Sequence, residues 1–191
     1  MPKSFYFLSI FVLLMTTAAA QEKFEREVRI DRQAVPSPAL EFIAACEFDK
    51  KIKWYQEWSQ EGLSYEAKSC KEDYLYSVEF DSLGRLLDVE RKIDFKAIAA
   101  GARGRIEAEL EAQFDRYKVQ KVQEQFSGEE ALVQGWIGGG EVPQGLRQRY
   151  EIVLKGRKGR EKKYYEFLFD LDGQLLKTAT IVDRPLDNIE F

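Results

Sequence analysis

The sequence predicts an α+β fold: a tandem repeat of one helix followed by antiparallel strands, with the helices packed on one face of a curved antiparallel sheet. Two observations lead to this prediction. Segments 76–87 and 165–176 align without a gap and are identical at six of twelve positions. Each copy lies in a run of strand-like alternation, and each run follows a segment with helical apolar spacing. One helix and four strands are therefore expected twice.

The first twenty residues are expected to be a signal peptide. Lys3 gives a positive start, an apolar run extends from Phe5 to Met15, and 18–20 are the small residues of a cleavage site. The run is shorter than the roughly 20 apolar residues that span a membrane. We therefore expect a periplasmic or secreted protein after removal of residues 1–20, with one repeat unit at 21–93 and a second at 94–191.

The first unit is expected to begin with a strand at 24–30. A helix should follow, with Ser37 as its N-cap and Pro38 at its first helical position, and end at 46–48. The strands after it alternate with period two. The side chains that this alternation places on the inner face are Ile52, Trp54, Trp58, Tyr65, Ala67, Tyr74, Tyr76, Val78, Phe80, Leu87, Val89 and Ile93.

The second unit is expected to begin with a longer helix at 96–117, whose apolar residues recur every three or four positions. Its strands should place Tyr150, Ile152, Leu154, Tyr165, Phe167 and Phe169 on the inner face, followed by Leu175, Ala179 and Ile181 or their neighbours. Between helix and hairpin, residues 127–148 are rich in glycine and are expected to form an inserted loop that carries Trp136.

Both copies contain the pattern Phe-Asp-x-x-Gly, at 80–84 and 169–173. The pattern predicts a tight turn in which the aspartate caps the backbone and the glycine adopts a positive φ. Asp170 and Asp172 also suggest a calcium loop, but the further oxygen ligands of such a loop are missing. We expect no metal and no cofactor.

The opposite parity of the strands predicts a solvated outer face. Its members are Tyr55, Glu57, Glu66, Lys68, Ser77, Glu79, Asp88, Glu90, Tyr164 and Glu166. Exposed aromatic side chains on a sheet face are typical of a binding surface. The residues selected for contact with a partner are Tyr55, Glu57, Glu66, Tyr164 and Glu166, together with Trp136 on the inserted loop.

The two cysteines, Cys46 and Cys70, have two interpretations. Export to an oxidising compartment favours a disulfide between them. The parity of Cys70, which belongs to the outer face while the helix carrying Cys46 should lie behind the inner face, favours two unpaired thiols.

Composition excludes several kinds of function. The chain has no histidine, which removes histidine bases, histidine metal ligands and Ser–His or Cys–His catalysis. The formal charge is −4, and neither this balance nor export suits a nucleic-acid partner. We expect a protein that is not an enzyme.

Segment 155–163 is strongly basic within this acidic chain. Its charged residues are Lys155, Arg157, Lys158, Arg160, Lys162 and Lys163, with two glycines between them that suit a hairpin turn. Such a hairpin can contact an anionic surface, such as lipid or lipopolysaccharide. Its charges can equally protect an exposed hairpin from pairing with other strands.

These features together resemble the PepSY-like family of exported bacterial proteins, which is related in fold to β-lactamase-inhibitor protein. The resemblance spans about residues 24–182, and its elements are the export signal, the helix after Val35-Pro36, Tyr65-Glu66, the turn at 80–84, Tyr150-Glu151 and the turn at 169–173. It implies a tandem unit without a catalytic centre that binds or inhibits another protein.

Two functional hypotheses follow. In the first, the protein is an exported, non-catalytic module that binds or inhibits an envelope protein or peptide through the exposed sheet face. In the second, it binds a small ligand in the cleft between the repeats, or an anionic envelope surface through the basic hairpin.

Overall fold

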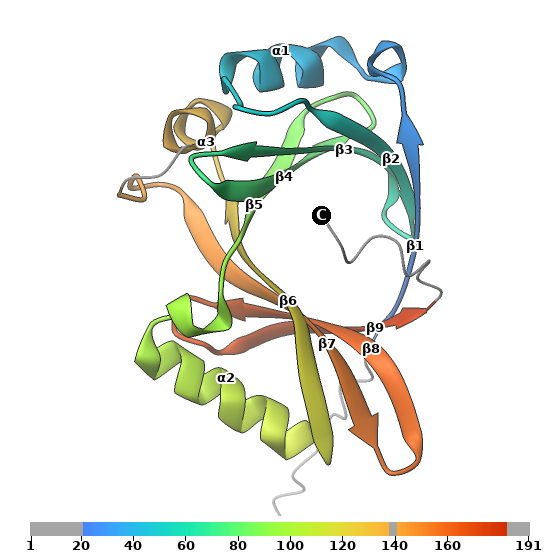
Figure 1. Ribbon diagram of the computed structural model, residues 1–191, viewed down its shortest axis with the longest axis vertical. Helices are drawn as coiled ribbons and strands as arrows, with labels where there is room; N and C mark the ends of the chain where they lie inside the picture. The colour runs from blue at the N-terminus through green and yellow to red at the C-terminus, as the bar shows by residue number, and fades with distance from the viewer. Residues whose placement is uncertain (1–20, 138–140, 183–191) are drawn as a thin grey trace, which may run out of the picture.

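The computed structural model describes residues 21–137 and 141–182, which form nine strands in one closed sheet (Figure 1). The predicted signal peptide lies outside the described residues. The strands are β1 (Gln21–Ile30), β2 (Lys53–Ser59), β3 (Gly62–Lys71), β4 (Tyr74–Asp81), β5 (Leu86–Lys92), β6 (Arg116–Ser127), β7 (Arg147–Lys158), β8 (Glu161–Asp170) and β9 (Leu175–Val182). The helices are α1 (Ser37–Ala45), α2 (Ala100–Gln113) and α3 (Glu130–Trp136).

The sheet closes into a barrel because β1 has a strand on each side. Its first half runs parallel to β9, from the pair Gln21 and Ala179 to the pair Phe24 and Val182. Its second half runs antiparallel to β2. Every other neighbouring pair is antiparallel and consecutive in sequence. The predicted fold class is therefore wrong: the chain forms a barrel, not an open curved sheet with helices on one face, because the two edge strands of that sheet pair with each other.

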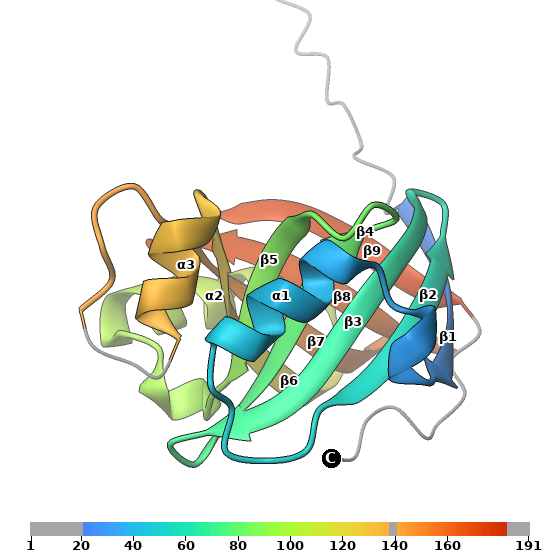
Figure 2. The same ribbon diagram turned by 90° about the horizontal axis from the view of Figure 1, so that it is seen from above.

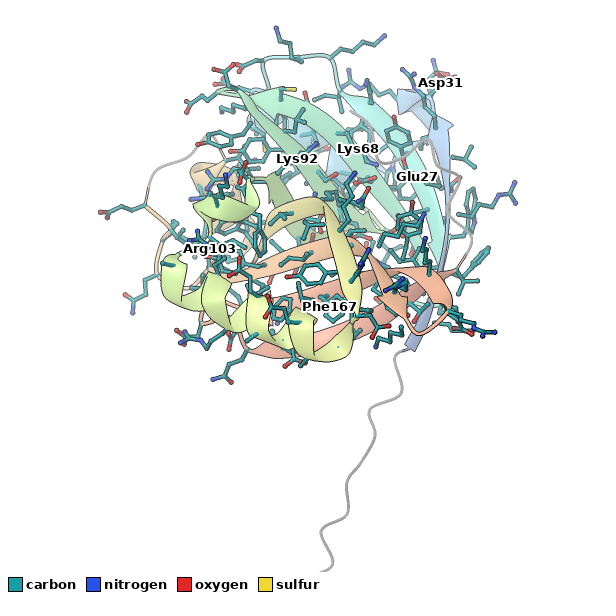
Figure 3. The ribbon with its side chains drawn as sticks, turned by 60° about the horizontal axis from the view of Figure 1, so that its bottom comes forward. Glu27, Asp31, Lys68, Lys92, Arg103 and Phe167 are labelled. Atoms are coloured by element: carbon teal, nitrogen blue, oxygen red, sulfur yellow. The ribbon has the colours of Figure 1, made fainter. Side chains whose placement is uncertain are left out.

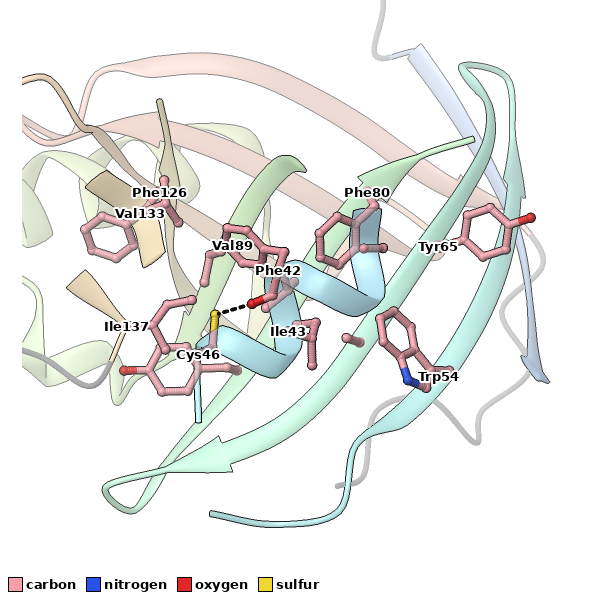
Figure 4. Close-up of a cluster of buried hydrophobic side chains, with 14 of the residues drawn as sticks. Phe42, Ile43, Cys46, Trp54, Tyr65, Phe80, Val89, Phe126, Val133 and Ile137 are labelled. Atoms are coloured by element: carbon pink, nitrogen blue, oxygen red, sulfur yellow. Dashed lines mark hydrogen bonds between the residues drawn. The ribbon is translucent and has the colours of Figure 1, made fainter. Parts of the chain in front are cut away.

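The helices lie outside the barrel wall (Figures 1 and 2). The first apolar cluster joins α1 and α3 to β2–β6, and its buried members include Phe42, Trp54, Phe80 and Val89 (Figure 4). The second apolar cluster joins α2 to β6–β8, through side chains such as Ile106, Leu110, Ile152 and Phe167. The apolar core thus consists of two layers outside the barrel, separate from its interior.

The predicted inner-face residues belong to these clusters. The six selected at 150–154 and 165–169 are buried in the second cluster, and most of those in the first unit are buried in the first. On β9, Leu175 packs against the second cluster, but Ala179 lines the barrel interior, because the register of β8 and β9 shifts between Leu168 and Phe169. Trp58, Tyr74 and Leu87 are exceptions, with about two-fifths of each side chain exposed. Period-two alternation therefore identified most of the core correctly.

The two Phe-Asp-x-x-Gly turns are confirmed, and they have the same geometry. The Oδ1 atom of Asp81 accepts from the backbone N–H groups of Leu83 and Arg85. That of Asp170 accepts from those of Asp172 and Gln174. Gly84 and Gly173 have φ angles of 83° and 82°. Each glycine also lies against the start of a helix: a Cβ on Gly84 would crowd Pro36 and Ala39 of α1, and a Cβ on Gly173 would overlap the carbonyl group of Ala102 in α2.

The expected helix limits need small corrections. The N-cap of α1 is Pro36, not Ser37, and no side chain caps it. The second helix spans 100–113, not 96–117. Residues 95–97 form a separate 3₁₀ turn, capped by the carboxylate of Asp94. At the other end, Phe114 leaves the helix in an extended conformation, and its ring covers Gly156 of β7.

The segment 127–148 was expected to be a loop, and this is wrong for residues 130–136, which form α3. Trp136 is 2% exposed, and its ring centroid lies 3.7 Å from that of Phe126. Glycine lowers helix propensity, but burial of Val133 and Trp136 in the first apolar cluster outweighs it. Trp136 is therefore a core residue and unsuited to contact a partner directly.

The disulfide is not formed. Cys46 is buried at the C-terminal end of α1 and donates its Sγ–H to the carbonyl of Phe42 at 3.2 Å (Figure 4). Cys70 is half-buried in β3. Cys70 has the strand parity of Glu66 and Lys68, opposite to the face that α1 covers. The argument from strand parity, which favoured two unpaired thiols, was therefore correct, and the argument from an oxidising compartment was not. Burial raises the pKa of the Cys46 thiol to about 12, although Lys71 lowers it slightly.

Replacing Gly173 by alanine should destabilise the protein by about 2–3 kcal/mol, because a positive φ costs about 1 kcal/mol or more and the Cβ overlaps α2. Urea unfolding measures this loss. The control is Gly104→Ala in the exposed part of α2, where a Cβ meets nothing. That variant should be stabilised by up to about 1 kcal/mol. Equal stabilities for both variants would contradict the close approach of turn and helix.

Cys46 should resist alkylation by iodoacetamide at pH 8 in the folded protein, because its thiol is buried and stays protonated. In urea without reductant, mass spectrometry should then find two alkylated cysteines. If neither cysteine is alkylated in urea until a reductant is added, the two cysteines form a disulfide.

Candidate functional site

The interior of the barrel contains a cavity of about 230 Å³, which we call the lumen cavity. The strand residues that line it have the opposite parity to the apolar clusters. They include most of the residues predicted to form a solvated outer face: Glu57, Glu66, Lys68, Ser77, Glu79, Asp88, Glu90 and Glu166. The parity prediction was correct, but closure of the sheet turns this face inward.

The lumen cavity is rich in charge. Of the residues that the structure describes, ten acidic and four lysine side chains line it. Each lysine has a carboxylate partner: Lys23 with Glu166 at 2.7 Å, Lys68 with Glu27 and Glu66, Lys121 with Glu151 at 3.8 Å, and Lys177 with Glu61 at 3.1 Å. If every group were ionised, the lining would carry an excess of six negative charges.

Lys68 is the most enclosed of these cations. Its Nζ lies 3.1 Å from both carboxylate oxygens of Glu27 (Figure 3). The same atom lies 2.8 Å from Oε2 of Glu66 and 4.6 Å from the ring centroid of Tyr55. Ser77 donates its hydroxyl to Glu66. Burial lowers the pKa of Lys68, but the charges of Glu66 and Glu27 outweigh this effect and raise it above its ordinary value. Lys68 is therefore a permanently charged ammonium group within the lumen cavity.

The carboxyl groups of β5 and β7 bind protons unusually well. Burial raises the pKa of Asp88 well above its ordinary value, and Glu79 and Glu151 raise it further. Burial, with the charges of Glu166 and Glu90, does the same for Glu151. Burial raises the pKa of Glu90 to about 7, against the opposing effect of Lys121. These three carboxyl groups line the cavity, but protein atoms surround them on most sides, so their ionisation is costly.

Two buried acceptors in this region lack hydrogen-bond partners among the described residues: Oδ1 of Asp88 and Oε1 of Gln123. The other oxygen of Asp88 accepts from Gln125 at 3.2 Å. Gln123 is 4% exposed and lies in β6 between Lys121 and Gln125, which both line the cavity. Strand alternation therefore places it on the same face. Buried acceptors without a donor are uncommon and costly, which indicates that a donor is missing here.

One group of carboxylates is close enough to hold a metal ion. Glu27, Glu57 and Glu66 each offer an oxygen, and these oxygens lie within 4.8 Å of one another. Lys68 already bonds to two of the three, so a metal ion would have to compete with a tethered ammonium group.

The other residues selected from the sequence are spread over several places. Tyr55 lies against Lys68 beside the cavity, and Tyr164 lies 5.1 Å from the ammonium group of Lys155. Trp136 lies in the first apolar cluster, outside the barrel. The structure thus brings together Tyr55, Glu57, Glu66 and Glu166, but not Trp136.

The basic segment forms the hairpin between β7 and β8, and its charges are divided. The ammonium group of Lys158 lies 4.6 Å from the ring of Phe114, and Lys163 pairs with Glu161 at 3.0 Å. Arg157 has the same strand parity as Lys155, opposite to Lys158. The hairpin therefore does not present its positive charges on one face.

Sequence reasoning missed the contributions of β1, β6, β7 and β9 to the cavity: Glu27, Lys23, Lys121, Gln125, Glu151 and Lys177. Glu151 was detectable, since it alternates with the predicted core residues Tyr150 and Ile152. The residues of β1 were not, because nothing local in the sequence indicates that this strand closes a barrel.

The raised carboxyl pKa values predict a pH dependence of stability. The folded protein holds protons that the unfolded chain releases between about pH 4.5 and 7, so the free energy of unfolding should fall as pH rises through this window. Glu90→Gln should remove part of this loss. At pH 8 it should be more stable than the parent by about 2 kcal/mol, since one pKa unit corresponds to about 1.4 kcal/mol and cavity water screens part of the effect.

Urea unfolding at pH 4.5 and pH 8 tests this, with Glu41→Gln on the exposed side of α1 as the control. The advantage of Glu90→Gln should nearly vanish at pH 4.5, where Glu90 is protonated in the folded protein and about half protonated in the unfolded chain. A variant that is less stable than the parent at pH 8 would show that Glu90 is ionised and favourably paired in the folded protein.

Comparisons with known proteins are informative about the fold alone. No family model and no curated protein matches the chain. Among solved structures, it is similar to the crystal structure of a DUF2874 family protein from Bacteroides ovatus ATCC 8483, with a TM-score of 0.52 and 15% sequence identity. The similarity covers 76% of this chain and 87% of that one. Within residues 21–137 and 141–182, no helix is long and apolar enough to span a membrane. The resemblance to PepSY-like proteins stays a prediction.

Proposed function

We propose that this protein is an exported, non-catalytic binding module that holds a small, water-soluble cation in its lumen cavity. The observation that carries the proposal is the imbalance of this cavity. Its carboxyl groups outnumber its lysines, and two buried acceptors, on Asp88 and Gln123, have no donor. A cation that also donates hydrogen bonds would correct both deficits.

The position of the polar residues favours a small ligand over a protein partner. Glu57, Glu66 and Glu166, which the sequence suggested as contacts on an exposed sheet face, surround the cavity. A folded protein cannot enter a space of about 230 Å³. The small-ligand hypothesis therefore has better geometric support, with the barrel interior taking the place of the expected cleft between repeats.

The chemistry around Ser77 supports binding rather than catalysis. Ser77 is paired with Lys68 in the register of β3 and β4, an arrangement that could suggest a serine nucleophile activated by lysine. A lysine base must lose its proton, but Glu66 and Glu27 hold Lys68 in its charged form. The hydroxyl of Ser77 donates to Glu66 and thereby helps to fix that carboxylate.

Thermal unfolding at pH 8 with small added compounds tests the proposal. Divalent metal salts and small organic amines should include compounds that raise the melting temperature, whereas neutral and anionic compounds of similar size should not. A cation at about 100 times its Kd stabilises the folded state by about 2.7 kcal/mol, which raises the melting temperature by roughly 5–10 °C.

The matched variant is Glu90→Gln combined with Glu151→Gln, which removes two carboxylates from the cavity while keeping the side-chain volumes. It should lose most of the shift, and Glu41→Gln should keep it. If no cation shifts the parent protein, or if the double variant responds as strongly as the parent, the lumen cavity is not a cation site.

A further inference from the structure

Lys68 shows what kind of cation the barrel interior accommodates. Its primary ammonium group is held by two carboxylates, Glu27 and Glu66, and lies against the ring of Tyr55. Carboxylates combined with an aromatic face are the usual recognition elements for organic ammonium groups. The residue is only 8% exposed, so this environment stabilises a buried ammonium group.

A second set of acceptors nearby has no such occupant. Asp88 and Glu90 lie on β5, Glu151 is their neighbour on β7, and Gln123 is the register partner of Glu151 on β6. Oδ1 of Asp88 and Oε1 of Gln123 lack donors, and Gln123 is more than nine-tenths buried. In the register, Gln123 is opposite Lys92 of β5, four residues from Asp88. A single ammonium group, which has three N–H donors, can therefore serve Glu90, Glu151 and Gln123, but not Asp88 and Gln123 together.

A metal ion suits this second set less well. Among residues 21–137 and 141–182, the carboxylates that converge closely enough for a metal are Glu27, Glu57 and Glu66, and Lys68 is bonded to two of them. Asp88, Glu90 and Glu151 do not belong to that group. Acceptors that are dispersed over neighbouring strands fit hydrogen-bond donors better than they fit short metal–oxygen bonds.

The rest of the cavity suits a short aliphatic chain with a second positive charge. Leu168 lines it, and in the register Leu168 lies between Glu151 of β7 and Lys177 of β9. Lys177 pairs with Glu61 at the exposed rim, where Glu22 also lines the cavity. A ligand could thus place methylene groups on Leu168, one ammonium group in the interior and the other near the acidic rim.

We propose that the cavity ligand is a linear aliphatic diamine, with one ammonium group bound among Glu90, Glu151 and Gln123. This inference rests on the proposed function and names its ligand class. Binding should displace protons from the carboxyl groups to the buffer, because these groups are partly protonated without a cation. The charged groups that face Asp88 and Glu90 from the neighbouring strands are Lys23, Glu66, Glu79, Lys121 and Glu151.

Isothermal titration calorimetry at pH 7 tests the proposal with four probes: 1,4-diaminobutane, 1-aminobutane, 1,4-butanediol and calcium chloride. The diamine should bind most tightly, the monoamine at least about tenfold more weakly, and the diol not at all, because each charge-assisted hydrogen bond contributes enough for a tenfold change. Titrations in two buffers of different ionisation enthalpy should show net proton release on diamine binding.

Glu90→Gln and Glu151→Gln should each weaken diamine binding at least about tenfold, and Glu41→Gln should leave it unchanged. Both cavity variants should fold, since they remove carboxyl groups that are costly to ionise. Diamine binding that these variants do not weaken would overturn the inference. Calcium binding without diamine binding would overturn the inference but support the proposed function, whereas binding of no cation would overturn both.

Discussion

The parallel pairing of β1 with β9 determines the character of this protein. It involves only four register pairs, between residues 21–24 and 179–182, yet it joins the two edges of the sheet. An open sheet would expose both edges and leave its polar face to solvent. Once closed, the same sheet encloses that face, so Glu66, Asp88 and Glu90 surround a cavity. The affinity for cations that we propose, and the raised carboxyl pKa values, both depend on this closure.

Closure also explains why the apolar core lies outside the barrel. Small barrels are commonly filled by inward-facing apolar side chains. Here the apolar face of the sheet points outward, and three helices cover it in two clusters. Burial of large side chains such as Phe80, Phe126 and Phe167 stabilises the wall from outside. The interior can therefore contain charged groups that a filled barrel would exclude.

The sequence contained most of the local information but not the closure. Alternation assigned Phe80 and Glu79 to opposite faces, and the repeated Phe-Asp-x-x-Gly pattern predicted two turns whose glycines lie against helices. Neither pattern indicates that β1 meets β9, because their residues lie at opposite ends of the described chain and the pairing is made by backbone groups. Helix α3 escaped prediction for a related reason: glycine propensity is a local signal, whereas burial of Trp136 against Phe126 is a tertiary one.

The charge of the interior is balanced in two different ways. Where a lysine is within reach, as for Glu27 and Glu66, the carboxylates pair with its ammonium group. Where none is close enough, as for Asp88, protons compensate for the missing cation. A cation that enters the cavity therefore mainly displaces protons from the carboxyl groups. It does not meet the full excess of six negative charges. Its affinity should depend less on the formal charge of the lining than on how well its donors match the acceptors of Asp88 and Gln123.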